Sequence, residues 1–309
     1  MAAVAGAADI GGTNTRVALI GDDGVIIATE RFPTPRGSDP RAVVAAVTAS
    51  LHRLLSAGPP RVLCGIGVSV AGPVDRDAGI ILHPPNMPFD EVPITAPLRD
   101  TFALPVFLAN DCRAAVRGEV FAGGGKGYQH LVYLTFSTGI GGGVYSHGEV
   151  LTGRGGNAGE IGHILVDTTY QQTCSCGGTG HWEGYASGRG IPLFYQTWCR
   201  THGMIPVSPC STAEEIFTAA SAGEPSASLF MHALARVNSR GLSTVIVAYD
   251  PEIIILDGPV VTNHFALVMQ PAIEHLDEYL PRPGIIISPL GGDAPLLGAA
   301  AGVFDSAGL

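Results

Sequence analysis

The stretch Asp9-Ile10-Gly11-Gly12-Thr13-Asn14-Thr15-Arg16 decides the fold, because it places a glycine turn between two apolar runs. The apolar runs predict two strands joined by this turn. Glycine lets a backbone approach a phosphate closely and aim its N–H groups at it. No Lys-Ser/Thr pair follows, so this is no Walker A loop, and the following strand excludes a dinucleotide-binding fingerprint. The candidate nucleotide-binding residues here are Asp9, Gly11, Gly12, Thr13, Asn14 and Arg16.

Asp9 stands at the end of the first predicted strand and has two interpretations. Its carboxylate is suited to hold a Mg²⁺-bound water, or it caps the glycine turn through an Asx hydrogen bond.

A second glycine turn, Ser137-Thr138-Gly139-Ile140-Gly141-Gly142-Gly143, suggests that the chain is duplicated. Ala7–Glu30 and Leu131–Thr152 both read as strand, glycine turn, strand, turn, strand. Each half later has a buried strand that ends in Gly-Pro-Val, at Gly72–Val74 and Gly258–Val260. Two facing glycine turns favour a phosphate site more than one does. The second turn adds the nucleotide-binding candidates Thr138, Gly139 and Gly141.

Apolar runs alternate with helical patterns along the rest of the chain, which predicts an α/β fold with mostly parallel central strands. A glycine-rich break, Gly123–Gly125, precedes the second repeat. We therefore expect an N-terminal lobe of residues 1–122, a C-terminal lobe of 123–294, and a helix at about 295–309 that packs back onto the first lobe. The clearest predicted strands are Val62–Val70, Leu131–Phe136 and Ile253–Leu256, and the clearest helices are Asp39–Gly58, Asp111–Ala122 and Pro225–Tyr249.

Composition narrows the function classes. The 309 residues carry a net charge of −10, and Lys126 is the single lysine, which argues against a nucleic-acid partner. Phosphates remain compatible with this charge, because backbone amides and Mg²⁺ can hold them. No long apolar run or signal peptide is recognisable, so we expect a cytoplasmic protein without a membrane partner. The six cysteines then sit in a reducing compartment, where clustered cysteines indicate metal rather than disulfides.

Asn110 and Asp111 follow a predicted strand and open a predicted helix. Position alone favours helix capping by either residue. The functional interpretation is that the Asp111 carboxylate takes a proton from an attacking hydroxyl.

Four nitrogen and sulfur donors stand close together further along the chain. Cys174 and Cys176 are followed by His181, and His163 precedes them at the end of a glycine-rich stretch that also carries Glu160. Cysteines two apart rarely form a disulfide, whereas two thiolates and two imidazoles suffice for tetrahedral zinc. We expect a structural zinc on His163, Cys174, Cys176 and His181.

Taken together, these motifs resemble the ROK family (repressor, open reading frame, kinase) over almost the whole chain. The matching segments are Asp9–Arg16, Gly65–Asp75, Asn110-Asp111, Thr138–Gly143, Glu160–His163 and Cys174–His181, which leads into Glu183.

The resemblance implies a two-lobed, actin-like ATPase fold of the ribonuclease-H-like class, with ATP and a sugar in the cleft between the lobes. Asp111 would be the base for a sugar hydroxyl, usually the 6-hydroxyl. ATP and Mg²⁺ would lie along the two glycine turns, and Gly258 is a further nucleotide candidate where the family often has two glycines. The sugar-binding candidates are Gly72, Asn86, Asn110, Glu160, His163 and Glu183.

One departure bears on the metal: the family usually has a cysteine where His181 stands. Zinc accepts either ligand, but an altered or empty knuckle is the alternative. The expected reaction is ATP-dependent phosphorylation of a free hexose, glucose first, with N-acetylmannosamine, N-acetylglucosamine or fructose as alternative substrates. A sugar-responsive transcription regulator is the alternative from another class, but Asp9 leaves no room before it for a DNA-binding domain. The family also suggests a homodimer or homotetramer.

Overall fold

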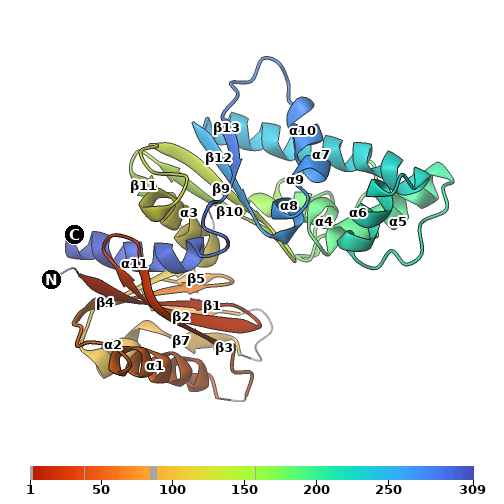
Figure 1. The fold of residues 1–309 in the computed structure, drawn as a ribbon. Coiled ribbons are helices and arrows are strands. Elements are labelled where there is room, and N and C mark those ends of the chain that lie inside the picture. The colour runs from red at the N-terminus through yellow and green to blue at the C-terminus, as the bar shows by residue number, and fades with distance from the viewer. Residues whose placement is uncertain (1–2, 38, 84–88, 157) are drawn as a thin grey trace. The chain divides into compact units, whose positions relative to one another are not determined.

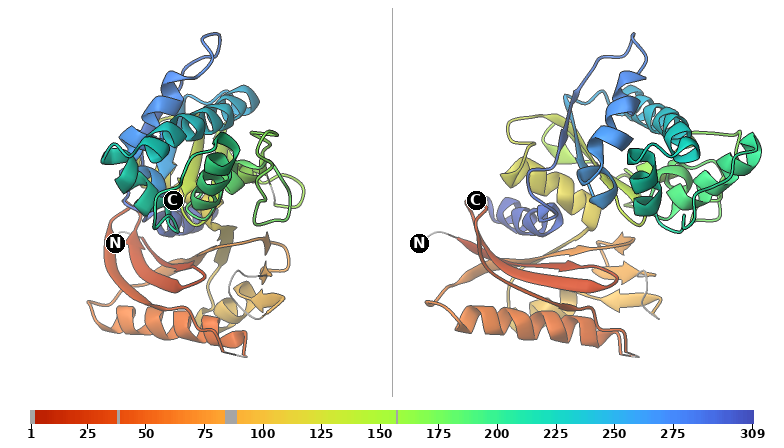
Figure 2. Two further views of the ribbon diagram at one scale, coloured as in Figure 1. Left: turned by 90° about the vertical axis from the view of Figure 1, so that its right-hand side faces the viewer. Right: turned by 45° about the vertical axis from the view of Figure 1, so that its right-hand side comes forward.

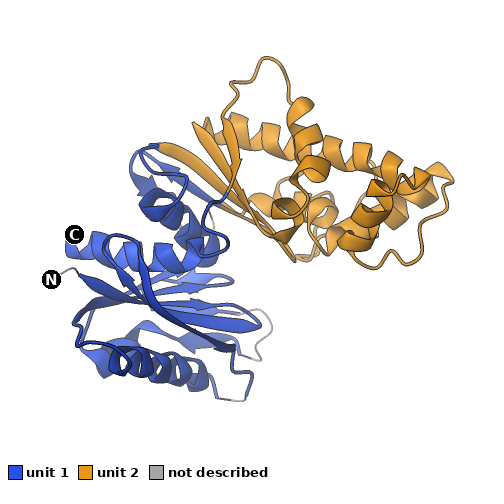
Figure 3. Ribbon diagram, viewed as in Figure 1, with its two compact units in different colours: residues 1–129, 143–158, 288–309 blue, residues 130–142, 159–287 orange. Residues whose placement is uncertain are grey.

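The computed structural model describes residues 3–37, 39–83, 89–156 and 158–309. The chain folds into two compact units (Figure 3): the first contains residues 1–129, 143–158 and 288–309, and the second contains 130–142 and 159–287. These units differ from the expected lobes, because 123–129, 143–158 and 288–294 belong to the first. The lobe boundaries at 122/123 and 294/295 stay a proposal.

The first unit is built on a five-stranded sheet of order β3-β2-β1-β4-β8, in which β1, β4 and β8 are parallel (Figure 1). A small three-stranded sheet, β5-β6-β7, accompanies it. The strands are β1 Val4–Ile10, β2 Asn14–Gly21, β3 Ile26–Pro33, β4 Leu63–Val70, β5 Val74–Asp75, β6 Ile80–Leu82, β7 Glu91–Pro93 and β8 Val106–Asn110.

Helices cover both faces of this sheet, as Figure 2 shows for the first unit. Alternate residues of β1 point to opposite sides: Ala8 and Ile10 join the core under α1, and Ala5 and Ala7 join the core under α11. This period-2 burial on both faces explains the continuous apolar runs in the sequence. The helices of this unit are α1 Arg41–Ser56, α2 Thr95–Phe102, α3 Asp111–Ala122 and α11 Ala294–Ala307.

Helix α3, which begins at the predicted base, packs against α11 at very short range. A Cβ on Gly298 would lie 1.6 Å from the Ala114 carbonyl oxygen, and a Cβ on Gly118 would lie 2.1 Å from the Ala294 carbonyl oxygen. Only glycine allows the two backbones to come this close. The C-terminal helix therefore holds the helix of Asp111 in place.

A second five-stranded sheet has the order β11-β10-β9-β12-β13, with β9, β12 and β13 parallel. The order matches that of the first sheet strand for strand, which confirms the duplication expected from the glycine turns. One of the chain crossings between the two compact units, at 142/143, falls within β10. The strands are β9 His130–Phe136, β10 Ile140–Ser146, β11 Glu149–Val150, β12 Ile253–Asp257 and β13 Gly284–Ile287.

Helix α7, the longest of the second unit, supports the region of the predicted knuckle. Its Asn238 accepts a 2.8 Å hydrogen bond from the indole of Trp182, which is fully buried, and a Cβ on Gly241 would lie 2.3 Å from the same indole. The helices here are α4 Trp182–Ala186, α5 Gly190–His202, α6 Ala213–Ser221, α7 Pro225–Tyr249, α8 Pro259–Thr262, α9 Phe265–Val268 and α10 Gln270–Glu274, with a 3₁₀ turn at Ile161–His163.

Among the described residues, none of the helices combines the length and the apolar character needed to span a bilayer.

Candidate functional site

The N-terminus of α3 separates the two roles that the sequence left open for Asn110 and Asp111. Asn110 is the N-cap: its side-chain oxygen accepts from the N–H groups of Cys112, at 3.0 Å, and Arg113. Its side-chain nitrogen donates to the Gly72 carbonyl, at 3.2 Å, and to Asp111 Oδ1, at 2.8 Å. Asp111 is the first residue of α3, and its Oδ1 accepts from the Asn110 side chain and from the Cys112 N–H, both at 2.8 Å.

The first glycine turn joins β1 to β2 and is closed by a 3.0 Å hydrogen bond from Gly11 N–H to the Asn14 carbonyl. Arg36 donates to the Gly12 carbonyl at 3.1 Å and lies 3.4 Å from the Thr13 hydroxyl. The predicted turn residues are thus together in the first unit.

Asp9 and Arg16 face each other across β1 and β2. Asp9 accepts from Arg16 at 3.0 Å and from Ser69 at 3.1 Å. Arg16 also donates at 2.6 Å to the carboxylate of Asp293 and to the Gly292 carbonyl. The carboxylate of Asp9 is therefore oriented by side chains beside it, and Arg16 is shared between two carboxylates.

Ser69 and Asp293 were missed from the sequence. Ser69 pairs with Asp9 in the parallel register of β1 and β4, and its only signal was a polar residue in an apolar run. Asp293 is the N-cap of α11, and the Gly-Gly-Asp-Ala-Pro start of that helix was its available signal. Nothing in the sequence joins it to Arg16, which is 277 residues away.

The second glycine turn lies between β9 and β10, and Glu183 is its unexpected partner. Glu183 Oε2 accepts from the Ile140 N–H at 3.0 Å, and a Cβ on Gly139 would lie 2.5 Å from the same oxygen. Glu183 Oε1 accepts from the Ser175 hydroxyl and lies 3.4 Å from the Cys174 sulfur. Glu183, a sugar candidate from the sequence, thus joins the glycine turn of Thr138, Gly139 and Gly141 to the cysteine segment.

The four expected metal ligands lie together in the second unit. One ligand atom from each of His163, Cys174, Cys176 and His181 lies within 4.8 Å of all the others. The Cys174 sulfur is 3.5 Å from His163 Nδ1, and the Cys176 sulfur is 3.3 Å from His181 Nδ1. Tetrahedral zinc with Zn–S of about 2.3 Å and Zn–N of about 2.05 Å separates sulfur from nitrogen by about 3.6 Å. The donor set fits one zinc ion.

Gly178, three residues before His181, leaves room for its ring, because a Cβ on Gly178 would lie 2.4 Å from that ring. Burial raises the pKa of the Cys174 thiol to about 11. Metal binding requires the thiolate and would release this proton. Glu160 stands beside the cluster, with its carboxylate 3.9 Å from His163 Nε2.

Asp167 anchors the segment between His163 and Cys174. It accepts from the N–H groups of Thr169, at 2.8 Å, and Tyr170, at 3.0 Å. Burial would raise its pKa, but these amides, Arg240 at 2.8 Å and the Tyr185 hydroxyl at 3.1 Å lower it overall. The carboxylate therefore stays charged and holds the segment to α4 and α7.

The remaining candidates are placed as follows. Gly72, at φ 102°, lies two residues after the end of β4, and its carbonyl accepts a hydrogen bond from the Asn110 side chain. Gly258, at φ 90°, begins α8, and a Cβ there would lie 2.4 Å from the Phe136 carbonyl oxygen. Asn86 lies outside the described residues.

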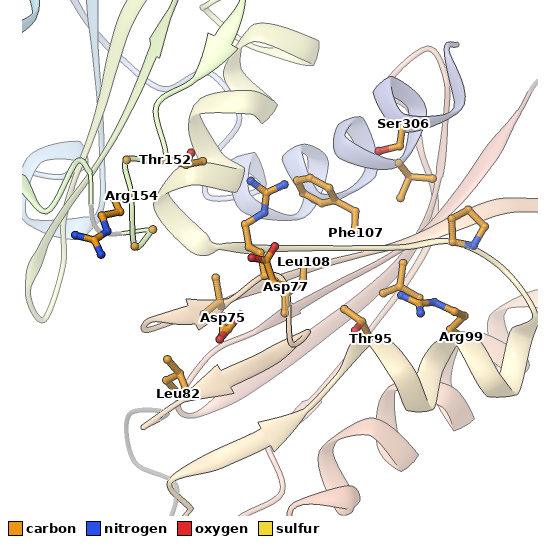
Figure 4. A pocket seen from close by; sticks show the side chains of 18 residues that line it. Asp75, Asp77, Leu82, Thr95, Arg99, Phe107, Leu108, Thr152, Arg154 and Ser306 are labelled. Carbon is orange, nitrogen blue, oxygen red and sulfur yellow. The ribbon is translucent and has the colours of Figure 1, made fainter.

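A cavity of about 720 Å³ in the first unit holds none of the predicted residues (Figure 4). Asp75, Asp77, Arg99 and Arg154 line it together with Phe107, so its charge is mixed. Cavity size alone would have pointed away from Asp111.

Comparison with known proteins agrees with this geometry. The duplicated sheet order and the paired glycine turns define an actin-like ATPase fold with two lobes. The sequence matches the ROK family over residues 5–305, and the chain belongs to that family.

Curated relatives are sugar kinases. A glucokinase of Pyrobaculum calidifontis is 35% identical over 296 residues, which cover 95% of this chain and 92% of the relative. An N-acetylmannosamine kinase of Escherichia coli O139:H28 is 34% identical over 303 residues, which cover 95% of this chain and 96% of the relative.

Solved structures give the same family. The ROK hexokinase of Thermus thermophilus superposes with a TM-score of 0.84 at 31% identity, covering 100% of this chain and 99% of that one. A ROK glucokinase of Streptomyces griseus, in complex with glucose and AMPPNP, has a TM-score of 0.75 at 28% identity and covers 96% of this chain and 98% of that one.

Proposed function

We propose that this protein transfers the terminal phosphoryl group of ATP to the 6-hydroxyl of a free hexose, with glucose as the first choice. The observation that carries the proposal is the start of α3 in a ROK-family chain. Asn110 caps the helix and donates to the carboxylate of Asp111, and that carboxylate also accepts from the Cys112 N–H at 2.8 Å. The glucokinases among the relatives support the substrate.

In this proposal Asp111 accepts the proton of the attacking hydroxyl as the phosphoryl group moves. Asn110 fixes the position of the carboxylate, and the Gly72 carbonyl fixes Asn110. Gly72, Asn86, Asn110, Glu160, His163 and Glu183 are the proposed sugar contacts.

We assign ATP to the two glycine turns, where backbone amides suit phosphate oxygens. Asp9 is the proposed partner of the Mg²⁺ hydration shell, and the magnesium would neutralise charge on the phosphates. The nucleotide contacts proposed are Gly11, Gly12, Thr13, Asn14, Arg16, Thr138, Gly139, Gly141 and Gly258.

Zinc on His163, Cys174, Cys176 and His181 would be structural, because protein ligands fill all four positions. It would hold Glu160 and Glu183 in place and perform no chemistry. Free cysteines throughout the described chain fit a cytoplasmic location, which we also propose. Assembly as a homodimer or homotetramer remains a prediction.

A panel of free sugars tests the proposal. ADP release with Mg-ATP should be fastest with glucose, and slower with fructose, N-acetylglucosamine and N-acetylmannosamine. Fastest turnover with N-acetylmannosamine would instead favour the activity named for the Escherichia coli relative. No sugar-dependent ADP release with any of them, from folded and zinc-loaded protein, would reject the proposal.

A further inference from the structure

A small cavity of about 120 Å³ lies beside the second glycine turn, entirely within the second unit. Thr138 and Gly139 of the turn form one side of it, and Glu183, Ser187 and Arg189 contribute to the others.

The backbone places Arg189 beside the turn. Gly188 N–H donates to the Ser137 carbonyl at 2.8 Å, and Arg189 N–H donates to the Thr138 carbonyl at 3.4 Å. A Cβ on Gly188 would lie 3.0 Å from the Ser137 carbonyl oxygen, so the absence of a side chain there lets the segment approach. Arg189 is thus held next to the residues assigned to phosphate.

The other cations near the glycine turns are already engaged. Arg16 is shared by Asp9 and Asp293, and Arg36 donates to the Gly12 carbonyl. Arg189 is exposed, and in the part of the chain that the structure describes it forms no ion pair. It is also the one basic side chain among the described residues that line this cavity.

We propose that Arg189 binds the β- and γ-phosphates of the nucleotide at the second glycine turn. The inference rests on the proposed function, because it assigns a cation to the nucleotide site of that reaction. A guanidinium suits the site, since its planar fork binds two phosphate oxygens at once. Arg189 also offsets the negative charge of Glu183, which lines the same cavity.

The test is isothermal titration of the full-length, zinc-loaded protein with MgATP, MgADP, AMP and glucose. Arg189→Ala should weaken MgATP and MgADP binding about 10- to 100-fold, the usual loss for hydrogen bonds to a charged group. AMP and glucose should bind within about twofold of the wild type, because neither carries a β-phosphate. Arg189→Lys should be intermediate, since ammonium is a point charge without the fork.

Arg200→Ala is the matched control, an exposed arginine near the end of α5, the helix that Arg189 precedes, and its side chain donates to Thr197 at 3.3 Å. It should bind all four ligands as the wild type does. Unchanged MgATP affinity in Arg189→Ala, or an equal loss for AMP, would overturn the inference. A wild-type protein that binds no MgATP would instead overturn the proposed function, so the two failures are distinguishable.

Discussion

Asn110 and Asp111 are neighbours in sequence but have different local roles in the structure. The sequence could not separate them, because asparagine and aspartate cap helices about equally well. The structure assigns the cap to Asn110, whose oxygen accepts from the first turn of α3. The side chain of Asp111 is oriented by the Asn110 amide and by the Cys112 N–H, each at 2.8 Å.

Replacing Asp111 with asparagine should separate catalysis from structure. A positioned base contributes about 10²- to 10⁴-fold, so Asp111→Asn should lower kcat by that order. The glucose Kd and the melting temperature should stay close to wild type, because Asn110 still caps the helix. Steady-state kinetics and calorimetry measure both. Asp100→Asn, an exposed carboxylate on α2, is the control, and near-full turnover of Asp111→Asn would show that Asp111 is not the base.

The partners of Arg16 could not all be inferred from the sequence. Its position after the glycine turn predicted a phosphate contact, and that contact stays a prediction. The structure adds two carboxylates, Asp9 from the neighbouring strand and Asp293 from the far end of the chain. The second partner depends on how α11 packs back, which no local pattern records.

At the scale of elements, the long helices and buried strands were predictable. The helices at Asp111–Ala122 and Pro225–Tyr249 begin and end where expected, and the expected strand at Ile253–Leu256 extends to Asp257. Apolar periodicity and terminal Gly, Pro or Asp residues carry that information. The short strands β5, β6 and β7 were missed, because two or three residues establish no period.

The cluster of four possible zinc ligands, His163, Cys174, Cys176 and His181, was predicted from donor spacing. His181→Ala should lower bound zinc from about one per chain to below about 0.2, because a structural zinc held by about 10–16 kcal/mol otherwise survives purification. The sugar KM should rise more than kcat falls. His181→Cys should keep zinc, since the ligand Nδ1 stands only one bond further from Cβ than a cysteine sulfur does.

Elemental analysis of the purified variants measures their zinc content. The control is His232→Ala, which replaces an exposed histidine on α7. Active wild-type protein with less than about 0.2 zinc per chain would rule out a structural zinc.

The lowered pKa of Asp167 lets us predict how acid affects the stability of the segment between His163 and Cys174. Its folded-state pKa is lowered, so its stabilising contribution is complete above the unfolded-state value of about 3.9 and is lost as pH falls through the folded-state pKa. Asp167→Asn should destabilise the protein by about 1–3 kcal/mol at neutral pH. It should also flatten the loss of stability below about pH 4.

Denaturant titrations from pH 3 to pH 7 measure both effects. Asp277→Asn, an exposed carboxylate in the second unit, should change neither. A parallel acid response in wild type and Asp167→Asn would contradict the role given to this carboxylate.

At the scale of the whole molecule, the repeat of strand and glycine turn predicted a duplicated chain, and the structure shows the duplication as two sheets of equal strand order. In these sheets β1, β4 and β8 are matched by β9, β12 and β13. The limits of the compact units were not predictable in the same way. Besides the expected C-terminal helix, residues 143–158 and 288–294 also belong to the first unit, and such returns depend on long-range packing.

The central claim is that the molecule moves phosphoryl from ATP to the 6-hydroxyl of a hexose, and the product itself tests it most directly. Purified protein should be incubated with Mg-ATP and glucose labelled with ¹³C at C6, and followed by ¹³C and ³¹P NMR. The account predicts one hexose 6-phosphate formed for each ADP, seen as phosphorus coupling on the C6 signal. Phosphate on another carbon, or ADP formed without any sugar phosphate, would contradict it.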